Sequence, residues 1–569
     1  MAFDLVIRNG TVIDGSGRQR YQADVGVIGD RIASIGRIRE RGATEIDAEG
    51  QIVAPGFIEV HSHLDAQVFW DSLGTCPAWH GVTTSIMGNC GFTLAPCREQ
   101  EMDLCLRNLE RAEDMSRDVL LAGIKWSWET YPEYLDTVDR LPKGINYAGY
   151  VGHSAVRAYV MGDRAFEEKA SEADLLAMRR EVESAIRAGA IGFSTSRSAS
   201  HQTSDGKRVA SRAADWSEVR SLVGVMAELG TGVFEITPNS TGDLESRPEH
   251  YAAMRDLAIE SGRPLTFILA HAPFQGDAWI KLLELVDDTL KQGGRMTIQA
   301  LARQVQTMLS FKSHLPFDKL PNWSKLRSRP LAEQAAALRD PQRRAQLVSE
   351  ATHGPYSDGA VGGETRPPDW DLMKVFDSTI GPYKSVAAVA KERSVSPVEL
   401  IIEMALNSDM DQFFVQPYAN HNLDDVRTIL SHPQAVIGGS DSGAHVSQIL
   451  DSSTPTFMLA YWVRRENAFT LEHAIRKLTF EPALIWGFAD RGLVARGMIA
   501  DLIVFDPDTI APAMPTVVSD LPGGGKRLKQ GAIGIGVTVV AGQVLLRDGQ
   551  HTGALPGRLL RGAVAIAGT

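Results

Sequence analysis

Two histidines, two residues apart, follow the first apolar run that reads as a buried strand. The segment reads Pro55-Gly-Phe-Ile-Glu-Val-His61-Ser-His63-Leu-Asp65. Side chains alternate along a strand, so His61 and His63 share one face, roughly 7 Å apart along the chain. A lone histidine more often caps a loop or packs as a half-buried aromatic, but a His-x-His pair before an acidic residue favours a divalent metal site. Such a site needs further ligands from elsewhere in the chain.

A cysteine and an aspartate follow two other apolar runs. Cys90 comes after the run 81–86, and Asp441 ends the run 435–440. Most buried cysteines are inert and most aspartates at such places form turns or helix caps. At the ends of strands that face one hole, however, the thiolate is a candidate ligand. The Asp441 carboxylate is a candidate ligand and a proton acceptor for water.

Two more histidines stand at the ends of expected strands. His153 lies in Tyr150-Val-Gly-His-Ser, where the ring could polarise a substrate carbonyl or simply hold the loop by hydrogen bonds. We take polarisation of a substrate carbonyl as the catalytic hypothesis for His153 and keep the loop-holding role as an open alternative. His271, in Leu269-Ala-His-Ala-Pro, is a candidate metal ligand.

The arrangement of the chain indicates how these side chains are positioned. Short apolar runs alternate with amphipathic helical stretches over about 400 residues, which favours an α/β fold with a TIM-like (β/α)₈ barrel whose active site lies at the C-terminal ends of its strands. Besides 57–60 and 81–86, expected strands are 145–151, 191–194, 232–236, 264–270, 413–417 and 435–440. Expected helices are 172–188, 217–228, 248–261, 280–292, 397–406 and 471–479.

Both ends of the chain read differently from the middle. Residues 1–54 and 485–569 carry short alternating strands with turn signals such as Asn9-Gly10 and Asp548-Gly549. Neither end holds enough strands for a core of its own, so we expect the termini to form one small composite β domain. The barrel then spans 55–484, with an excursion at about 305–385 that we interpret as a lid or substrate wall.

Composition and charge exclude several classes of function. With 569 residues the chain is long enough for a large catalytic domain and a smaller one. A formal net charge of −12 disfavours nucleic acid and anionic membranes as partners, which leaves a small molecule. No run resembles a signal peptide or a membrane span, and four cysteines within 76–105 are no disulfide framework. We expect a cytoplasmic protein; its oligomeric state stays open.

Taken together, the motifs resemble the amidohydrolase superfamily and, within it, the N-acyl-D-amino-acid deacylase (D-aminoacylase) family. The likeness covers nearly the whole chain. It rests on the segments 55–65, Gly88-Asn-Cys-Gly-Phe-Thr-Leu-Ala-Pro96, Gly152-His-Ser-Ala-Val-Arg157, Gly192-Phe-Ser-Thr195, Gly439-Ser-Asp441 and 491–506, which follow in the family order.

The resemblance implies hydrolysis of an amide C–N bond by water activated by zinc, with one or two Zn²⁺ ions. It places His61, His63 and Asp441 around one metal, makes Asp441 the general base, and puts Cys90 where other amidohydrolases use a carboxylated lysine. The family also has a histidine on each of the fifth and sixth strands. Here Thr237 stands at the fifth, with Glu235 as a substitute oxygen ligand on the same face, and His271 stands slightly out of register on the sixth.

Three functions follow as hypotheses. The leading one is a metal-dependent hydrolase of an N-acyl amino acid, of D configuration if the likeness extends that far, or of a related linear amide. The second is a cyclic-amide or aryl-amide hydrolase with the same metal centre. The third is a barrel without metal that serves as a binding protein, which the missing fifth-strand histidine keeps open.

Overall fold

The computed structural model describes residues 3–110, 113–114, 116–239, 247–356 and 367–562. Its centre is built from two sheets of parallel strands. One sheet holds β6 (Phe57–Glu59), β7 (Val82–Met87) and β8 (Asn146–Gly149); a second holds β9 (Val151–Gly152), β10 (Gly192–Ser196), β11 (Val233–Thr237), β12 (Leu265–Leu269), β13 (Met296–Ala300) and β17 (Ala435–Ile437).

Backbone hydrogen bonds join the two sheets into a closed barrel. The Tyr150 amide donates to the Met87 carbonyl at 3.0 Å, so β8 and β9 together fill one position in the ring. On the other side, the Asp441 amide donates to the His61 carbonyl at 3.1 Å, which joins β17 to β6. The expected (β/α)₈ barrel is therefore confirmed, and the ends of its first and last strands lie side by side.

Helices cover the outside of this barrel. They are α3 (Tyr131–Arg140), α4 (His153–Met161), α5 (Glu172–Ala188), α6 (Trp216–Leu229), α7 (Arg247–Ser261), α8 (Ala278–Lys291), α14 (Leu423–Ser431), α16 (Leu471–Leu478) and α17 (Phe480–Trp486). The predicted helix 172–188 has the bounds of α5. A capping box between Ser171 and Asp174 starts it, and Gly189 in the left-handed region (φ 112°) ends it.

One strand of the barrel differs from the sequence prediction. Residues 413–417 do form a strand, β16 (Phe413–Ala419), but it pairs antiparallel with β14 (Val305–Leu309) and β15 (Lys374–Phe376) outside the barrel. The barrel position belongs to β13 instead. Its Thr297 and Gln299 interrupt the apolar run that marks the other barrel strands, which explains why the sequence pattern missed it.

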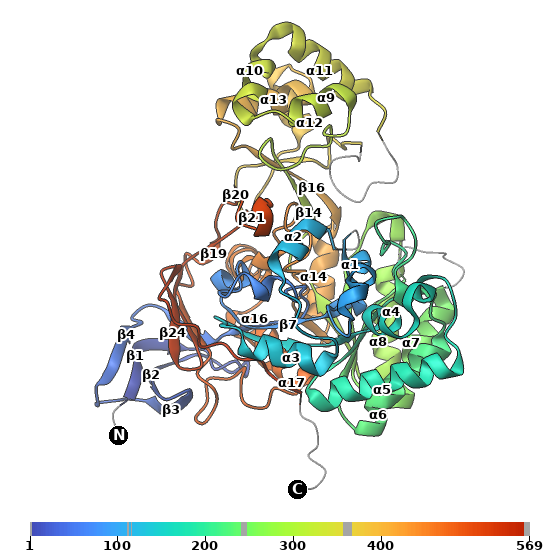
Figure 1. Cartoon of the computed structure of the whole chain (residues 1–569). Helices are drawn as coiled ribbons and strands as arrows, with labels where there is room; N and C mark the ends of the chain where they lie inside the picture. The colour runs from blue at the N-terminus through green and yellow to red at the C-terminus, as the bar shows by residue number, and fades with distance from the viewer. Residues whose placement is uncertain (1–2, 111–112, 115, 240–246, 357–366, 563–569) are drawn as a thin grey trace.

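The excursion is longer than expected and has a core of its own. It holds α9 (Pro321–Arg327), α10 (Leu331–Arg339), α11 (Pro341–His353), α12 (Val386–Arg393) and α13 (Pro397–Asn407) above the small antiparallel sheet (Figure 1). Trp323, Leu338 and Ile401 are buried in one cluster of apolar side chains that belongs to this part. Part of the expected range 305–385, residues 357–366, lies outside the described residues.

Both termini contribute to one β domain, as expected. Its nine-stranded sheet contains β1 (Phe3–Val12), β2 (Tyr21–Ile28), β3 (Arg31–Gly36), β4 (Gly42–Asp47), β5 (Ile52–Pro55), β18 (Leu502–Phe505), β23 (Ile535–Val540), β24 (Gln543–Arg547) and β25 (Gln550–His551). Strand β18 pairs antiparallel with β5, and Leu5, Val27 and Val539 share one core. The sheet thus needs both ends of the chain, whereas the domain boundaries at 54 and 485 stay predictions.

Smaller elements complete the chain: α1 (Met102–Leu109), α2 (Arg117–Gly123), α15 (Thr454–Phe457), the π-helix Met458–Arg465, β19 (Ala511–Pro512), β20 (Thr516–Val518), β21 (Arg527–Lys529) and β22 (Ala532–Ile533). Among the residues that the structure describes, none of the helices has both the length and the apolar character needed to cross a membrane.

Candidate metal centre and active site

The His-x-His pair stands at the junction of the first and last barrel strands. The His63 amide donates to the Ser442 carbonyl at 2.7 Å, and the Ser62 amide to the Ile86 carbonyl at 3.0 Å. These bonds fix both histidines against neighbouring strands. The rings of His61 and His63 are 1% exposed and lie edge to face, with centroids 5.5 Å apart.

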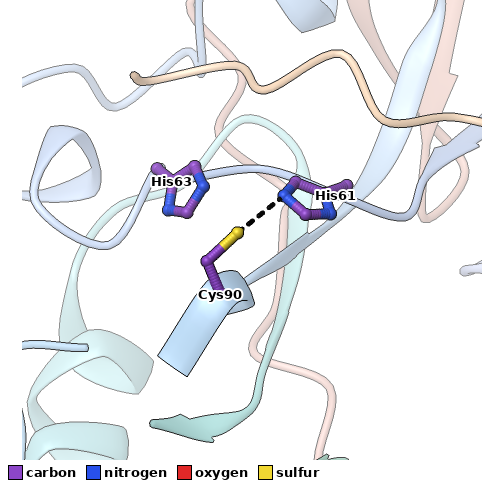
Figure 2. Close-up of side chains that lie close together, drawn as sticks. All are labelled: His61, His63 and Cys90. Atoms are coloured by element: carbon purple, nitrogen blue, oxygen red, sulfur yellow. Dashed lines mark hydrogen bonds between the residues drawn. The ribbon is translucent and has the colours of Figure 1, made fainter. Parts of the chain in front are cut away.

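Cys90 faces these rings from the end of β7 (Figure 2). It sits in the 3₁₀ turn Asn89–Gly91 with φ 59°, a conformation that a side chain rarely adopts. Its Sγ lies 3.4 Å from His61 Nε2 and accepts a hydrogen bond from Thr237 Oγ1 at 3.0 Å. A tight turn with unusual backbone geometry therefore aims the thiol into the barrel mouth, as strained residues at functional sites often do.

Asp441 closes the group from the opposite side. Its backbone also has a positive φ, 55°, and its Oδ1 lies 3.1 Å from His63 Nε2 and 3.7 Å from His61 Nε2. The structure thus brings together four side chains that the sequence singled out: His61, His63, Cys90 and Asp441.

Electrostatics in this group indicate a missing positive charge. Burial raises the pKa of the Cys90 thiol well above its usual value, and nearby carboxylates raise it further. Burial also raises the pKa of Glu235 to about 8 and that of Glu113 to about 7. For His63, burial alone would lower the pKa, but Glu113 and Asp441 outweigh it and raise the pKa to about 9. A divalent cation would stabilise the anionic forms of all these groups.

The tautomer of His61 suits a metal ligand. Its Nδ1 lies 2.6 Å from Gln299 Oε1, an oxygen that can only accept, so Nδ1 carries the proton and Nε2 keeps its lone pair on the side of Cys90. Burial lowers the pKa of His61, and the charge of Asp441 offsets this effect only in part. The resulting pKa of about 4 keeps the ring neutral at pH 7. Gln299 belongs to β13, the strand that the sequence pattern missed.

Two further side chains near the thiol also escaped the sequence analysis. Within the described residues, potential ligand atoms lie within 4.8 Å of one another in three groups: His61, His63 and Cys90; His63, Glu113 and Asp441; and Cys90, Glu113 and His201. Glu113 follows α1 and His201 follows β10, both in loops. No residue spacing connects such loop positions with Cys90, so only the folded chain reveals them.

Glu235, the substitute ligand suggested by the sequence, lies below Cys90. Its Oε2 accepts a hydrogen bond from the Cys90 amide at 2.8 Å, whereas its Oε1 has no hydrogen-bond partner among the described residues. It is in none of the three groups of ligand atoms. The observed contact makes Glu235 a residue that holds the turn of Cys90.

His271 is not placed with the other candidate ligands. Its Nε2 faces Asp425 Oδ2 at 3.6 Å and its ring packs against Trp279. In the described part of the chain it joins none of the groups of ligand atoms. The reason is its register: β12 ends at Leu269, and the His271 amide is held by Asn420 Oδ1 at 2.8 Å, which directs this part of the loop toward α14.

His153 has both ring nitrogens engaged away from the metal ligands. Its Nδ1 lies 2.8 Å from Thr195 Oγ1 and its Nε2 lies 2.8 Å from Glu218 Oε1. Glu218 also pairs with Arg157, and the His153 ring is fully buried. Since no ring nitrogen is left for a substrate carbonyl, these contacts favour the second alternative, in which His153 holds the loop, over the catalytic hypothesis.

The substitution His153→Asn separates the two roles. We expect it to lower the free energy of unfolding by about 1–3 kcal/mol, because it leaves buried partners incompletely hydrogen-bonded, and to change kcat by less than about threefold. Urea unfolding and steady-state kinetics on the same preparation measure both. A loss of kcat by a hundredfold or more at unchanged stability would return His153 to the chemistry.

A cavity of about 520 Å³ opens next to His63. Its wall includes Trp70, Arg117 and Leu120 from α2, and Lys526 from the C-terminal segment. A second cavity of about 680 Å³ shares His314, Ser447 and Lys526 with the first and extends to the excursion. The excursion therefore forms part of the wall of a chamber that reaches the candidate metal ligands.

Comparisons with known proteins agree with this geometry. D-aminoacylase from Alcaligenes xylosoxydans xylosoxydans is 29% identical over 98% of this chain and 97% of its own length. N-acyl-D-glutamate deacylase from the same organism is 28% identical over 99% and 98%. A solved structure of D-aminoacylase, a protein described with a binuclear metal centre, is 25% identical, covers 98% of this chain and 100% of its own, and has a TM-score of 0.65.

The family model described as amidohydrolase family matches residues 44–546, which include the whole barrel and part of the composite β domain. The resemblance found in the sequence motifs is thereby confirmed. This chain belongs to the amidohydrolase family.

Proposed function

We propose that the protein is a zinc-dependent amidohydrolase that cleaves the amide C–N bond of an N-acyl amino acid. The observation that carries this proposal is the convergence of His61, His63, Cys90 and Asp441 at the mouth of one barrel. The full-length similarity to two deacylases of N-acyl-D-amino acids supports the substrate class.

The side chains present fit a zinc ion. Imidazole, thiolate and carboxylate are the ligands that zinc prefers, and potential ligand atoms of all three kinds lie here in overlapping groups. His63 Nε2 faces the carboxylates of Asp441 and Glu113, at 3.1 and 3.4 Å, without hydrogen-bond geometry to either, and Oε1 of buried Glu113 has no hydrogen-bond partner among the described residues. Buried polar atoms are normally satisfied, so these point to a cation between them. When bound, zinc would polarise the scissile carbonyl and lower the pKa of the attacking water toward about 7.

Asp441 is the residue that we assign to proton transfer. One of its carboxylate oxygens accepts the proton of the attacking water and later delivers it to the nitrogen of the leaving amine. Burial would raise its pKa, but the adjacent charged ring of His63 dominates and lowers the pKa below the usual range, so the carboxylate starts ionised. The contact with His63 Nε2 at 3.1 Å also holds the oxygen in place.

The chamber has the charge that an N-acyl amino acid requires. The second cavity, of about 680 Å³, is lined by five basic side chains, Lys312, Arg327, Arg329, Lys526 and Arg527, and by one acidic side chain, Asp318. Three of the five are neutralised by ion pairs, Lys312 with Asp411, Arg327 with Asp318 and Arg527 with Asp520, which leaves Arg329 and Lys526 without an ion pair in the described part of the chain. A basic wall attracts an anionic substrate and retains its carboxylate outside the reacting amide.

We further propose that the protein works in the cytoplasm on a small molecule. The four cysteines are unpaired thiols, which suits a reducing compartment. The oligomeric state is not part of this proposal.

A substrate screen tests the proposed function. The zinc-loaded protein is offered N-acetyl-D- and N-acetyl-L-amino acids, each next to the corresponding carboxamide, which lacks the negative charge. We expect turnover of the amino acids, with one stereoisomer preferred by at least about a hundredfold in kcat/KM, and slower turnover of the carboxamides. Turnover restricted to cyclic or aryl amides would replace this function by the second hypothesis. No turnover together with no zinc uptake would support the metal-free barrel.

A further inference from the structure

His201 is a partly buried side chain of the loop after β10 that lies against the candidate metal ligands. One of its ring nitrogens lies within 4.8 Å of Cys90 Sγ and of a carboxylate oxygen of Glu113. When Cys90 and Glu113 are ionised, their sulfur and oxygen atoms can only accept hydrogen bonds, whereas an imidazole can donate one. Of the three members of this group, His201 is therefore the one that can act as a donor.

Three contacts hold His201 in place before any substrate arrives. Its amide donates to the Ser198 carbonyl at 3.2 Å, and its carbonyl accepts a hydrogen bond from Arg212 Nη1 at 3.0 Å. Its ring packs against Phe92, with centroids 5.2 Å apart. A donor that is already in position costs no reorganisation when negative charge develops next to it.

The hydrogen bonds of Ser196 determine which ring nitrogen of His201 carries a proton. His201 Nδ1 lies 2.7 Å from Ser196 Oγ, and the same oxygen accepts a hydrogen bond from the Ser198 amide at 3.1 Å. Within the described residues, the Ser196 hydroxyl has no acceptor for its own hydrogen other than His201 Nδ1. The hydroxyl therefore donates to Nδ1, which places the ring proton on Nε2. A doubly protonated ring would carry a proton on Nε2 as well.

From these contacts we propose that His201 is a catalytic residue whose Nε2–H donates a hydrogen bond to the carbonyl oxygen of the scissile amide. Water attacks the carbonyl carbon, gives one proton to Asp441, and the π electrons of the carbonyl move to its oxygen. When the tetrahedral intermediate collapses, the C=O bond reforms, the C–N bond breaks and Asp441 returns the proton to the leaving nitrogen, which yields a carboxylic acid and an amine. His201 keeps its proton throughout. The inference rests on the proposed function, because it presupposes this hydrolysis.

The effect of such a donor falls on kcat more than on KM. A hydrogen bond to an ionised oxygen is roughly twice as strong as one to a neutral carbonyl, so His201 stabilises the intermediate more than the bound substrate. His201→Phe keeps an aromatic ring next to Phe92 but has no N–H. We expect its kcat to fall by about 10²–10³-fold, with KM within about threefold of the unchanged protein. In His201→Gln the side-chain amide still offers a donor, so its kcat should exceed that of His201→Phe by about tenfold or more.

Two measurements other than turnover separate a donor from a metal ligand. The first is inhibition by a phosphonate analogue of the substrate found in the screen, in which a tetrahedral phosphorus replaces the carbonyl carbon. Its inhibition constant should rise in His201→Phe by the same factor by which kcat/KM falls, because the analogue resembles the intermediate. The second is elemental analysis of zinc per chain, which should be the same in His201→Phe as in the unchanged protein.

His432→Phe is the matched control. His432 is also partly buried and has one ring nitrogen engaged, since its Nδ1 accepts a hydrogen bond from the Gln434 amide at 3.2 Å. It precedes β17, whereas Asp441 follows it, so His432 lies at the opposite end of the barrel. Its kcat and inhibitor affinity should stay near normal. Circular dichroism and thermal unfolding establish that each variant is folded, and His201→Ala, which also lacks the donor, replaces His201→Phe if the latter is not.

The outcomes distinguish this inference from the proposed function. Normal kcat and normal inhibitor affinity in a folded variant without the donor would overturn the role of His201 and leave the proposed hydrolysis intact. A raised KM with unchanged kcat would also overturn it, because His201 would then bind substrate and intermediate equally. Loss of zinc in His201→Phe would make His201 a ligand instead of a donor. If the unchanged protein turned over no N-acyl amino acid, the proposed function would fail and this inference with it.

Discussion

Asp441→Asn is expected to lower kcat by about 10²–10⁴-fold, the range by which a positioned general base accelerates a reaction. The carboxamide retains the shape of the side chain but cannot take up a proton at neutral pH. In the native protein His63 lowers the pKa of Asp441, so the carboxylate is ionised and ready to accept the water proton. Steady-state hydrolysis of the substrate found in the screen measures the effect, and elemental analysis follows the zinc content.

Zinc content should change far less than kcat in this variant. The amide oxygen of asparagine can still face the metal, while His61, His63 and Cys90 are untouched. A matched control is Asp425→Asn, since the Asp425 side chain is 25% exposed, compared with 27% for Asp441, and also faces a histidine. We expect its kcat to stay near normal. An Asp441→Asn protein with normal kcat would remove this residue from the mechanism.

The sequence could reveal His61, His63, Cys90 and Asp441 because each follows an apolar strand and all strand ends of a barrel meet at one face. The same rule fails for His271. A side chain two positions beyond the end of a strand no longer has the orientation set by the strand, and here the hydrogen bond that the His271 amide donates to Asn420 Oδ1 directs the backbone away from the metal ligands. A displacement of two residues beyond the strand end thus decides whether a histidine reaches the metal ligands.

Loop residues set the other limit on what the sequence could show. Glu113 reaches His63 because the His445 amide, from a loop after β17, holds its carbonyl. His201 depends on Ser196 and Phe92, which come from two different strand ends. These contacts join segments far apart in the chain and have no periodic pattern. Neither residue could therefore be assigned to the site before the folded arrangement was known.

The same reasoning applies to β13 and β16. Residues 413–417 are apolar enough for a barrel strand, yet their alternating burial suits an antiparallel sheet with one exposed side. Residues 296–300 carry Thr297 and Gln299 and still form a fully buried barrel strand, because Gln299 is needed inside to hold the ring of His61. Gln299 therefore contacts a candidate metal ligand from inside the barrel, and a search for apolar runs overlooks a strand that carries such a polar residue.

The second large effect is expected for Cys90→Ser. Serine nearly preserves the volume but provides no thiolate, and Cys90 belongs to two of the three groups of potential ligand atoms. We expect zinc affinity to fall by more than about a hundredfold, since even residues outside the first ligand sphere change it by about 10–100-fold, and activity at limiting zinc should fall with it. Competition with a chromogenic chelator measures the affinity.

Thermal unfolding provides an independent measurement of the same loss. Zinc at 100 times its dissociation constant stabilises the folded chain by about 2.7 kcal/mol, so the stabilisation by added zinc should be strongly reduced in Cys90→Ser. Cys105→Ser is the control, because Cys105 is also buried and unpaired but donates to the Thr93 carbonyl, away from the histidines. It should keep normal zinc affinity. If Cys90→Ser bound zinc as tightly as this control, the thiol would not be a ligand, and the metal site would have to be assigned to imidazole and carboxylate ligands alone.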